Sequence, residues 1–509
     1  MTIPTDNVYV DAVLLGGNDR LGNVFTYFFD DNDVLTNGNT IEGFVWAEEE
    51  KSAFRAALSA WSKIADVSFS EAGSAEEADF VQHKFDTAGM AALNLEESFG
   101  ASDHPLSVDD SSQAHTAFNW EKYNFPGPDG YSSASLEAGG LAYWVYIHQI
   151  GHVLGLAHPD SDEEGSSIFP GVAMITDLGV HELNQAIYSV MSLNPGWNMQ
   201  DPLGAGLNSE GYNTGPGAID IAAIQYLYGA NLTYKGGDDV YKLRTHSGLK
   251  AIWDTGGNDT IEWGGKRDAV IDLRPATLDG GAHTGGYVSY VKGSNSFGGF
   301  TIADDFTNVL ADERGQTGVI IENAVGGSGD DLLNGNRVDN LLEGKSGNDV
   351  LNGRGGNDSL EGSYGDDFLR GQKGDDVVRG GNGEDILSGN NGNDRVIGGA
   401  GKDDLRGGNG NDTLKGGTGA DTLQGGNGAD VFEFSTGDGA DRIKSFDAVS
   451  ALHDVIDLSG LESVKGWKDL MNNHLDVVGD DVLIDGKNGD EILLKDVNFT
   501  DLDKDDFLF

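Results

Sequence analysis

The chain has 509 residues, enough for two or three domains that each bury a core. Its 84 acidic residues against 32 lysines and arginines give a formal charge of −52, which excludes DNA, RNA and anionic membrane surfaces as partners. The chain contains no cysteine, so neither disulfides nor thiolate metal sites are available to it.

The sequence also lacks the signals of membrane insertion and of cleaved export. No apolar run approaches the roughly 20 residues that a membrane helix requires. The segment Met1 to Asp6 has no basic stretch leading into an apolar one. We therefore expect neither membrane insertion nor a cleaved N-terminal secretion signal.

The first part of the chain has the pattern of an α+β domain. Alternating apolar residues predict three strands, at residues 24–29, 67–69 and 80–85. Residues 48–64 have helical spacing with one apolar face, and a second helix is predicted over residues 140–154. We place this domain at residues 1–235, with the second helix lying against the sheet.

The second helix carries three histidines at a characteristic spacing. His148 and His152 are four residues apart and therefore project from the same helix face. Gly155 allows a left-handed turn, after which the chain can return and deliver His158. Three neutral imidazoles suit one zinc ion and leave a fourth position for water, as in catalytic sites. Because the glycine and histidine spacing is that of the complete metzincin motif, incidental histidines on a buried helix are a poor alternative.

The residue after the first histidine departs from that motif. Metzincins have a glutamate there, which takes a proton from the zinc-bound water, whereas this chain has Gln149. An amide resembles a carboxylate in shape but cannot accept the proton. Downstream, Met191 is in the right order for the Met-turn beneath the zinc, although a single methionine is often only core filling. The motif thus predicts a zinc site and questions its catalytic competence.

From about residue 236 the chain becomes rich in glycine and aspartate. Lys235 to Asp239 and Asp254 to Asp259 look like isolated copies of a turn that later becomes regular. An ordinary Gly-Asp turn remains the alternative for each of them. We treat residues 236–325 as a connecting β region.

Residues 326–433 repeat every nine residues without an insertion, in twelve units. The consensus is GGxGxDxUx, where U is apolar, which is the calcium-binding β-helix repeat. The eighth position is apolar in every unit, which a flexible Gly/Asp linker would not maintain. The unit that begins at Gly335 is degenerate, with Val338 in place of glycine and Asn340 in place of aspartate.

The period has a direct physical explanation. The apolar residue points inward from a three-residue strand and is buried only when neighbouring units stack on it. The glycine-rich turn offers backbone carbonyls and one carboxylate, the oxygen ligands that calcium prefers. We expect a right-handed parallel β-roll that folds as about ten calcium ions bind. The candidate ligands are Gly327, Gly329, Asp331, Asp349, Asp358, Asp367, Asp376, Asp385, Asp394, Asp403, Asp412, Asp421 and Asp430.

Short apolar strands return after the array, at residues 455–458, 482–484 and 492–494. We therefore expect a C-terminal β region over residues 434–509. The chain ends with the segment Asp505 to Phe509, in which acidic residues precede three bulky apolar ones.

These features together resemble the serralysin family, which comprises secreted, zinc-dependent metzincin endopeptidases with calcium-binding RTX repeats. The resemblance rests on His148 to Pro159, on Met191, on the run Asp220 to Gln225 and on the array, and it covers nearly the whole chain. It implies an α+β metzincin catalytic domain followed by an all-β parallel β-roll and a C-terminal β region. It also implies one zinc ion, several calcium ions, a protein or peptide substrate and an extracellular location. We further expect a monomer.

The resemblance assigns roles to individual residues. It places the zinc on His148, His152 and His158, puts Gln149 at the general-base position and makes Met191 the Met-turn residue. Serralysins usually add a tyrosine ligand two residues after that methionine, and here the position is Leu193. A calcium ion at the domain junction would be bound by Lys235, Gly237, Asp239, Asp254, Gly256, Gly257 and Asp259.

Two further roles follow from the same resemblance. Glu322, just before the first repeat, would help to cap the array. The C-terminal segment resembles the uncleaved signal of the type I secretion machinery.

Two functions therefore remain open. The chain is either a serralysin-type endopeptidase impaired by Gln149, or a natural pseudoprotease that binds zinc and calcium without cleaving. An engineered substitution would account for Gln149 but not for Leu193, which mildly favours natural loss.

Overall fold

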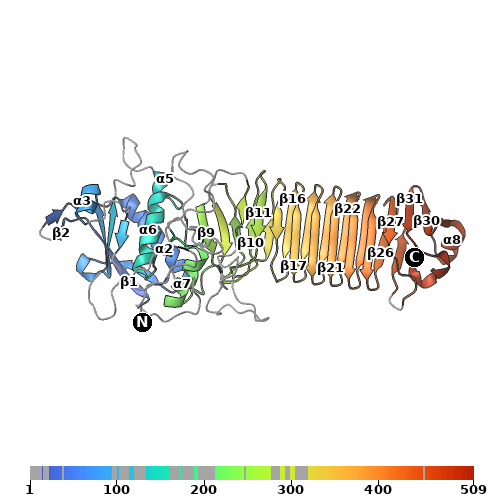
Figure 1. Cartoon of the computed structure of the whole chain (residues 1–509), viewed down its shortest axis with the longest axis horizontal. Helices are drawn as coiled ribbons and strands as arrows, with labels where there is room; N and C mark the ends of the chain where they lie inside the picture. The colour runs from blue at the N-terminus through green and yellow to red at the C-terminus, as the bar shows by residue number, and fades with distance from the viewer. Residues whose placement is uncertain are drawn as a thin grey trace.

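The computed structural model describes residues 14, 22–36, 39–93, 100–102, 114–119, 133–159, 172, 188–192, 213–245, 248–276, 287–292, 298–303, 319–450 and 453–509. The molecule is elongated, with a helix-containing domain at one end, a long stack of strands in the middle and a smaller β region at the other end (Figure 1). The α+β domain and the following β-roll confirm the fold class expected from the sequence.

The N-terminal domain is built on a five-stranded sheet with the strand order β4-β1-β5-β7-β6. Four strands run parallel and only β6 is antiparallel to its neighbour. The strands are β1 (Val24–Asp30), β4 (Ser68–Glu71), β5 (Phe80–Phe85), β6 (Gly100–Ser102) and β7 (Ala114–Asn119). A hairpin of β2 (Val34–Thr36) and β3 (Asn39–Ile41) follows β1 in the chain.

The longest helix of this domain, α2 (Glu48–Ile64), has the bounds that its apolar spacing predicts. Its first turn carries three glutamates, which the positive end of the helix dipole favours. Phe54 and Trp61 on its inner face are fully buried in the core between helices and sheet. The other helices among the described residues are α3 (Thr87–Ala92), α5 (Ser133–Leu136), α6 (Leu141–Val153) and α7 (Ala218–Tyr228).

The connecting region starts the two sheets of the roll. Strands β8 (Val240–Lys242), β10 (Thr260–Glu262) and β14 (Asn323–Val325) begin one sheet, and β11 (Ala269–Asp272) and β12 (Tyr290–Val291) begin the other. A separate parallel pair is formed by β9 (Gly248–Ile252) and β13 (Gly298–Ile302).

The array forms a parallel β-roll in which successive repeats alternate between the two sheets. Neighbouring strands of one sheet are therefore 18 residues apart, as in the pair Leu342 and Leu360. The eighth-position side chains of both sheets face inward and are 0% exposed, from Leu333 to Phe432.

From β16 onward the strands of the roll are longer than the three residues expected, because pairing continues into the turn. Arg354 still pairs with Gln372 after the apolar position has been passed. The strands are β15 (Leu332–Asn334), β16 (Leu341–Ser346), β17 (Val350–Gly355), β18 (Ser359–Tyr364), β19 (Phe368–Lys373), β20 (Val377–Asn382), β21 (Ile386–Asn391), β22 (Arg395–Gly401), β23 (Asp404–Asn409), β24 (Thr413–Gly419), β25 (Thr422–Asn427) and β26 (Val431–Ser435).

The C-terminal region continues both sheets beyond the repeats. It consists of β27 (Ala440–Lys444), β28 (Val455–Gly460), α8 (Trp467–Asn473), β29 (Leu475–Val478), β30 (Asp481–Lys487), β31 (Asp490–Leu494) and β32 (Phe507–Leu508). The last strand pairs with β28 at the end of the 11-stranded sheet, and Phe507 is buried there. Among the described helices, none is long and apolar enough to cross a membrane.

Candidate metal centre

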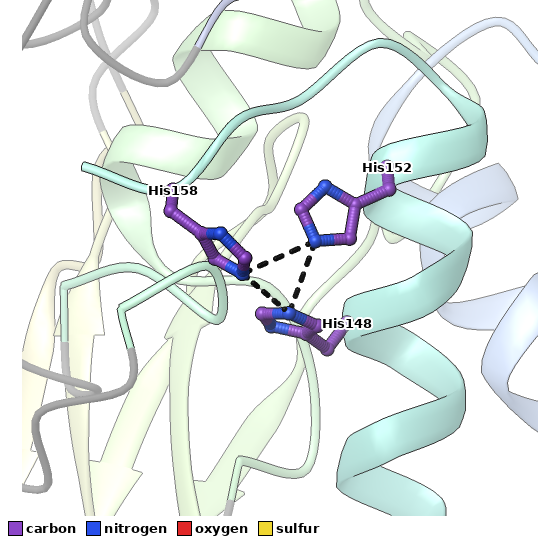
Figure 2. A group of neighbouring side chains, drawn as sticks. All are labelled: His148, His152 and His158. Atoms are coloured by element: carbon purple, nitrogen blue, oxygen red, sulfur yellow. Dashed lines mark hydrogen bonds between the residues drawn. The ribbon is translucent and has the colours of Figure 1, made fainter. Parts of the chain in front are cut away.

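Helix α6 and the turn that follows it bring three histidines together. The helix ends after Val153, and Gly155, with a φ of 95°, reverses the chain so that His158 returns towards His148 and His152. The three Nε2 atoms lie 3.0–3.2 Å from one another (Figure 2). Zinc–nitrogen bonds of the usual length at a tetrahedral angle would separate ligand nitrogens by roughly 3.3 Å.

The hydrogen bonds on the far side of two rings decide which nitrogen faces the centre. Nδ1–H of His148 donates to the carbonyl oxygen of Val190, and Nδ1–H of His152 donates to that of Leu156, each at 2.9 Å. Because a neutral imidazole carries one N–H, both Nε2 atoms must then present lone pairs. Two lone pairs that face each other at 3.1 Å repel unless a cation lies between them. The donor set therefore fits zinc.

The floor beneath the histidines is apolar and tightly packed. Met191 is fully buried, and a Cβ added to Gly151 of α6 would lie only 2.6 Å from its Sδ atom. The same Cβ would lie 3.3 Å from Trp61 of α2. Glycine at this position thus lets α6 approach Met191 closely.

Helix α7 holds this floor in place through Asp220. Its Oδ1 accepts a hydrogen bond from the Ser189 hydroxyl (2.6 Å), and its Oδ2 accepts from the backbone N–H groups of Val190 (2.6 Å) and Gly217 (2.8 Å). Complete burial raises the pKa of this carboxyl to about 6, although the three hydrogen bonds act in the opposite direction. Asp220 therefore fixes the segment whose Val190 carbonyl orients His148.

Two other residues of α7 tie the surrounding helices together. The Gln225 amide donates to the carbonyl oxygen of Ile64 at the end of α2 (2.8 Å), and the Tyr228 hydroxyl donates to that of Leu154 at the end of α6 (3.0 Å). In the sequence, the run Asp220 to Gln225 stands out only as part of the resemblance to the serralysin family. The polar residues within an apolar helix, Asp220 and Gln225, were the available sign of a positioning role.

Gln149 lies on α6 directly after His148, and its side chain is buried, with 5% exposed. Gln149 is therefore not a surface residue. Leu193 lies outside the described residues.

The junction between the domains holds a second candidate site. Carboxylate oxygens of Asp239, Asp254 and Asp259 lie within 4.8 Å of one another. Burial, followed by repulsion from neighbouring carboxylates, raises the pKa of Asp259 to about 7. Its Oδ2 atom is buried without a hydrogen-bond partner among the described residues. Such a group of oxygens fits a calcium ion.

The other residues expected at this junction site lie beside the three carboxylates. Gly237 and Gly257 approach so closely that a Cβ on Gly257 would lie 2.6 Å from the carbonyl group of Gly237, and Gly256 also has a positive φ. Lys235 places its ammonium 2.9 Å from Asp239. The side chain of Glu322 accepts a hydrogen bond from the N–H of Asp259 (2.7 Å) and so links this cluster to the start of the array.

The array repeats one carboxylate arrangement along its length. The Oδ1 atom of each sixth-position aspartate from Asp349 to Asp430 accepts the N–H of the residue 18 positions earlier, at 2.7–2.9 Å. The Oδ2 atom is buried and has no hydrogen-bond partner among the described residues in Asp349, Asp358, Asp367, Asp376, Asp385, Asp394, Asp403, Asp412, Asp421 and Asp430. Buried carboxylate oxygens without donors require a cation or a proton, so these turns fit calcium.

Two family models match the chain, one in its N-terminal part and one over the array. A family model described as matrixin, a peptidase family, matches residues 36–185. A model described as RTX calcium-binding nonapeptide repeat matches six overlapping stretches between residues 325 and 443. The first family implies zinc and the second implies calcium.

Curated relatives combine the same two parts. Metallopeptidase AprA of Pseudomonas marginalis is 28% identical over 63% of this chain and 61% of its own length. Serralysin of Proteus mirabilis is 31% identical over 57% of this chain and 54% of its own. Serralysin C of Dickeya chrysanthemi is 30% identical over 65% of this chain and 62% of its own length. Each match spans less than two thirds of the relative. The matrixin domain, the RTX repeats and these homologues together support a metzincin of the serralysin family.

Proposed function

We propose that the chain is a secreted zinc metalloendopeptidase of the serralysin type, stabilised by calcium in its RTX domain and impaired by Gln149. The convergence of three Nε2 atoms, two of them fixed as lone-pair donors, supports the proposal most directly. His148, His152 and His158 would hold the zinc. Bound there, zinc would polarise a peptide carbonyl and lower the pKa of a coordinated water.

The chain's own residues then determine how far catalysis proceeds. The carbonyls of Val190 and Leu156 hold two histidine rings in orientation, and Asp220 holds the Val190 segment. Gln149 can donate and accept hydrogen bonds at the centre but cannot take up a proton. A positioned general base is worth about 10²–10⁴ in rate, so hydrolysis should be slower by that order.

Protein or peptide substrates, an extracellular location and a monomeric state belong to the same proposal. Export by a type I system would use the acidic and apolar segment Asp505 to Phe509. In the folded chain Phe507 is buried in β32, which pairs with β28. A transporter would therefore have to bind this segment before β32 pairs with β28.

The first test measures metal content and hydrolysis together. We expect the zinc-reconstituted chain to hold one zinc ion through the three histidines, and His152→Ala to lose it. We expect Gln149→Glu to raise casein hydrolysis by about 10²-fold or more at unchanged zinc content. Gln149→Ala is the matched control, since it alters the same position without supplying a base and should remain as slow as the unaltered chain.

The second candidate function is that of a natural pseudoprotease, which Gln149 itself favours. It would be the better explanation if Gln149→Glu stayed inert while one zinc ion was bound, since other parts of the cleft would then also have been lost. Full activity of the unaltered chain would show that another residue supplies the base and that the mechanism proposed here is wrong.

A further inference from the structure

The twelve turns of the array fall into two classes by the backbone of their second residue. In the ten turns from Gly344 onward that residue has a φ between 79° and 130°. The ten residues are Lys345, Arg354, Ser363, Gln372, Gly381, Asn390, Gly399, Gly408, Gly417 and Gly426. Gly327 and Asn336, the second residues of the first two turns, have no positive φ among the described residues.

The same division separates the carboxylates. The ten turns with positive φ are the ten whose sixth-position aspartate, from Asp349 to Asp430, has a buried Oδ2 atom without a hydrogen-bond partner. In none of these turns does the N–H of the second residue reach that oxygen. A Cβ on Gly353 would lie 2.3 Å from Oδ2 of Asp358 and 2.9 Å from the carbonyl oxygen of Gly371. Both oxygens therefore border one small space. The first turn shares this arrangement, since a Cβ on Gly326 would lie 2.6 Å from Oδ2 of Asp331 and 2.6 Å from the carbonyl oxygen of Gly344, so the two classes differ in the hydrogen bonds of the carboxylate.

The first turn is closed by hydrogen bonds instead. Oδ2 of Asp331 accepts the N–H of Gly327 and its Oδ1 accepts the N–H of Ala269, both at 2.6 Å. Both oxygens of this aspartate are thus satisfied within the chain.

The second turn is closed in the same way, with an amide. Oδ1 of Asn340 accepts the N–H of Asn336 (2.8 Å). Its Nδ2 group donates to the carbonyl oxygen of Glu322 (2.9 Å) and to Oδ1 of Asn336 (3.2 Å). An NH₂ group carries partial positive charge and offers no lone pair to a cation. Hydrogen bonds therefore satisfy the polar atoms of Asn340, whereas the Oδ2 atoms of the later aspartates have no such partner among the described residues.

We propose that calcium binding begins at Asp349, and that the turns closed by Asp331 and Asn340 form a metal-free cap at the N-terminal end of the array. The inference rests on the proposed function in that it takes the later repeats to bind calcium. It departs from the expectation that Gly327, Gly329 and Asp331 are calcium ligands.

The cap also prepares the first calcium-binding turns. The N–H of Asp331 donates to Oδ1 of Asp349 (2.7 Å), and the N–H of Asn340 donates to Oδ1 of Asp358 (2.8 Å). One aspartate on each sheet is thereby oriented by a turn that needs no ion. Through Ala269 and Glu322 the cap is in turn held by the connecting region.

Crystals of the full chain grown with terbium in place of calcium test the proposal directly. We expect anomalous peaks beside the aspartates from Asp349 onward and none within ligand distance, about 2.3–2.6 Å, of Asp331. A peak at Asp331 or at Asn340 would overturn the cap while leaving calcium binding by the repeats intact. Peaks in none of the twelve turns would overturn both the cap and the calcium part of the proposed function.

Native mass spectrometry of calcium-loaded full-length variants gives an independent count. Asp331→Ala should keep the full number of ions, whereas the matched change Asp349→Ala should lose at least one. Asn340→Asp should gain none, because Asn336 still closes the turn. Loss of an ion from Asp331→Ala, or a gain in Asn340→Asp, would contradict the proposal. If Asp331→Ala does not fold, the terbium map of the unaltered chain decides.

Discussion

At the scale of single residues, Asp220 shows how a buried carboxylate can orient a proposed zinc ligand, His148, through the backbone of another segment. It gathers three donors on the Met-turn side of α7, and the segment that it holds presents the Val190 carbonyl to His148. Partners of this kind typically change metal affinity by 10–100-fold when they are lost.

We expect Asp220→Ala to weaken both the fold and zinc binding. The change leaves Ser189, Val190 and Gly217 with buried donors, at about 1–3 kcal/mol for each unsatisfied group. Zinc affinity, measured by competition with a chromophoric chelator, should fall by about 10-fold or more. Asp220→Asn keeps one acceptor oxygen and should give intermediate losses.

Asp86→Ala is a suitable control for this experiment. Asp86 caps α3 through a 2.6 Å hydrogen bond from Gly89, and Met90 of that helix belongs to a separate apolar cluster. Its loss should cost about 1 kcal/mol of stability and leave zinc affinity unchanged. Equal zinc affinity in Asp220→Ala and the unaltered chain would reduce Asp220 to a purely structural role.

The three histidines could be predicted from the sequence, whereas the contact between Asp220 and the segment Ser189 to Val190 could not. His148, His152 and His158 lie within eleven residues, so helical geometry and one glycine turn are enough to place them together. Asp220 meets the Met-turn across about 30 residues, and that contact depends on the packing of α7, which no local pattern encodes. The partners of Gly151 escaped prediction for the same reason.

At the scale of elements, the helices and the roll followed their periodicities, but the turns of the roll did not follow the consensus. The strongly amphipathic α2 began and ended where predicted. The repeat consensus has glycine at the second position, yet Lys345, Ser363 and other residues with side chains adopt a φ near 80° there. A residue with a Cβ in that region carries about 1–2 kcal/mol of strain, which surrounding contacts must offset.

This difference predicts unequal effects of two opposite substitutions. Ser363→Gly relieves strain but adds chain entropy to the unfolded state, so calcium-saturated stability should change by less than about 1 kcal/mol. Gly399 has a φ of 122°, and a Cβ there would lie 2.1 Å from the carbonyl oxygen of Gly381. Gly399→Ala should therefore cost about 2 kcal/mol or more.

Denaturant unfolding in saturating calcium measures both variants. Gly437, which also has a positive φ but open space around its Cβ position, provides the control Gly437→Ala. If Gly399→Ala and Gly437→Ala cost the same, backbone strain alone and not the close approach of turns explains the glycine.

At the scale of the whole molecule, we expect the acidic chain to depend on counter-charge for its folded form. The aspartates of the array are buried, and burial together with repulsion between successive carboxylates raises the pKa of Asp358 to about 8 and that of Asp349 to about 7. The shift is smaller at Asp385, where burial, followed by repulsion from Asp366, raises the pKa to about 6. These values describe the calcium-free chain.

The sign of the pH dependence follows from these shifts. The folded carboxyls bind protons more tightly than unfolded ones, whose pKa is near 3.8. A calcium-free folded array is therefore most stable below about pH 4 and loses stability as the pH rises to about 8. Bound calcium replaces the protons and should abolish this loss.

We accordingly expect calcium-stripped protein to keep more strand structure at pH 4 than at pH 8, with the loss centred between about pH 6 and about pH 8. Far-ultraviolet circular dichroism after treatment with a chelating resin follows this, since soluble chelators bind calcium poorly in acid. In samples with calcium restored, the strand content should stay constant across the same pH range. Asp358→Asn, which removes the carboxyl with the largest shift cited here, should move the calcium-free transition to higher pH. A calcium-free transition in the opposite direction, with strand content rising from pH 4 to pH 8, would show that the buried carboxylates do not govern folding of the roll.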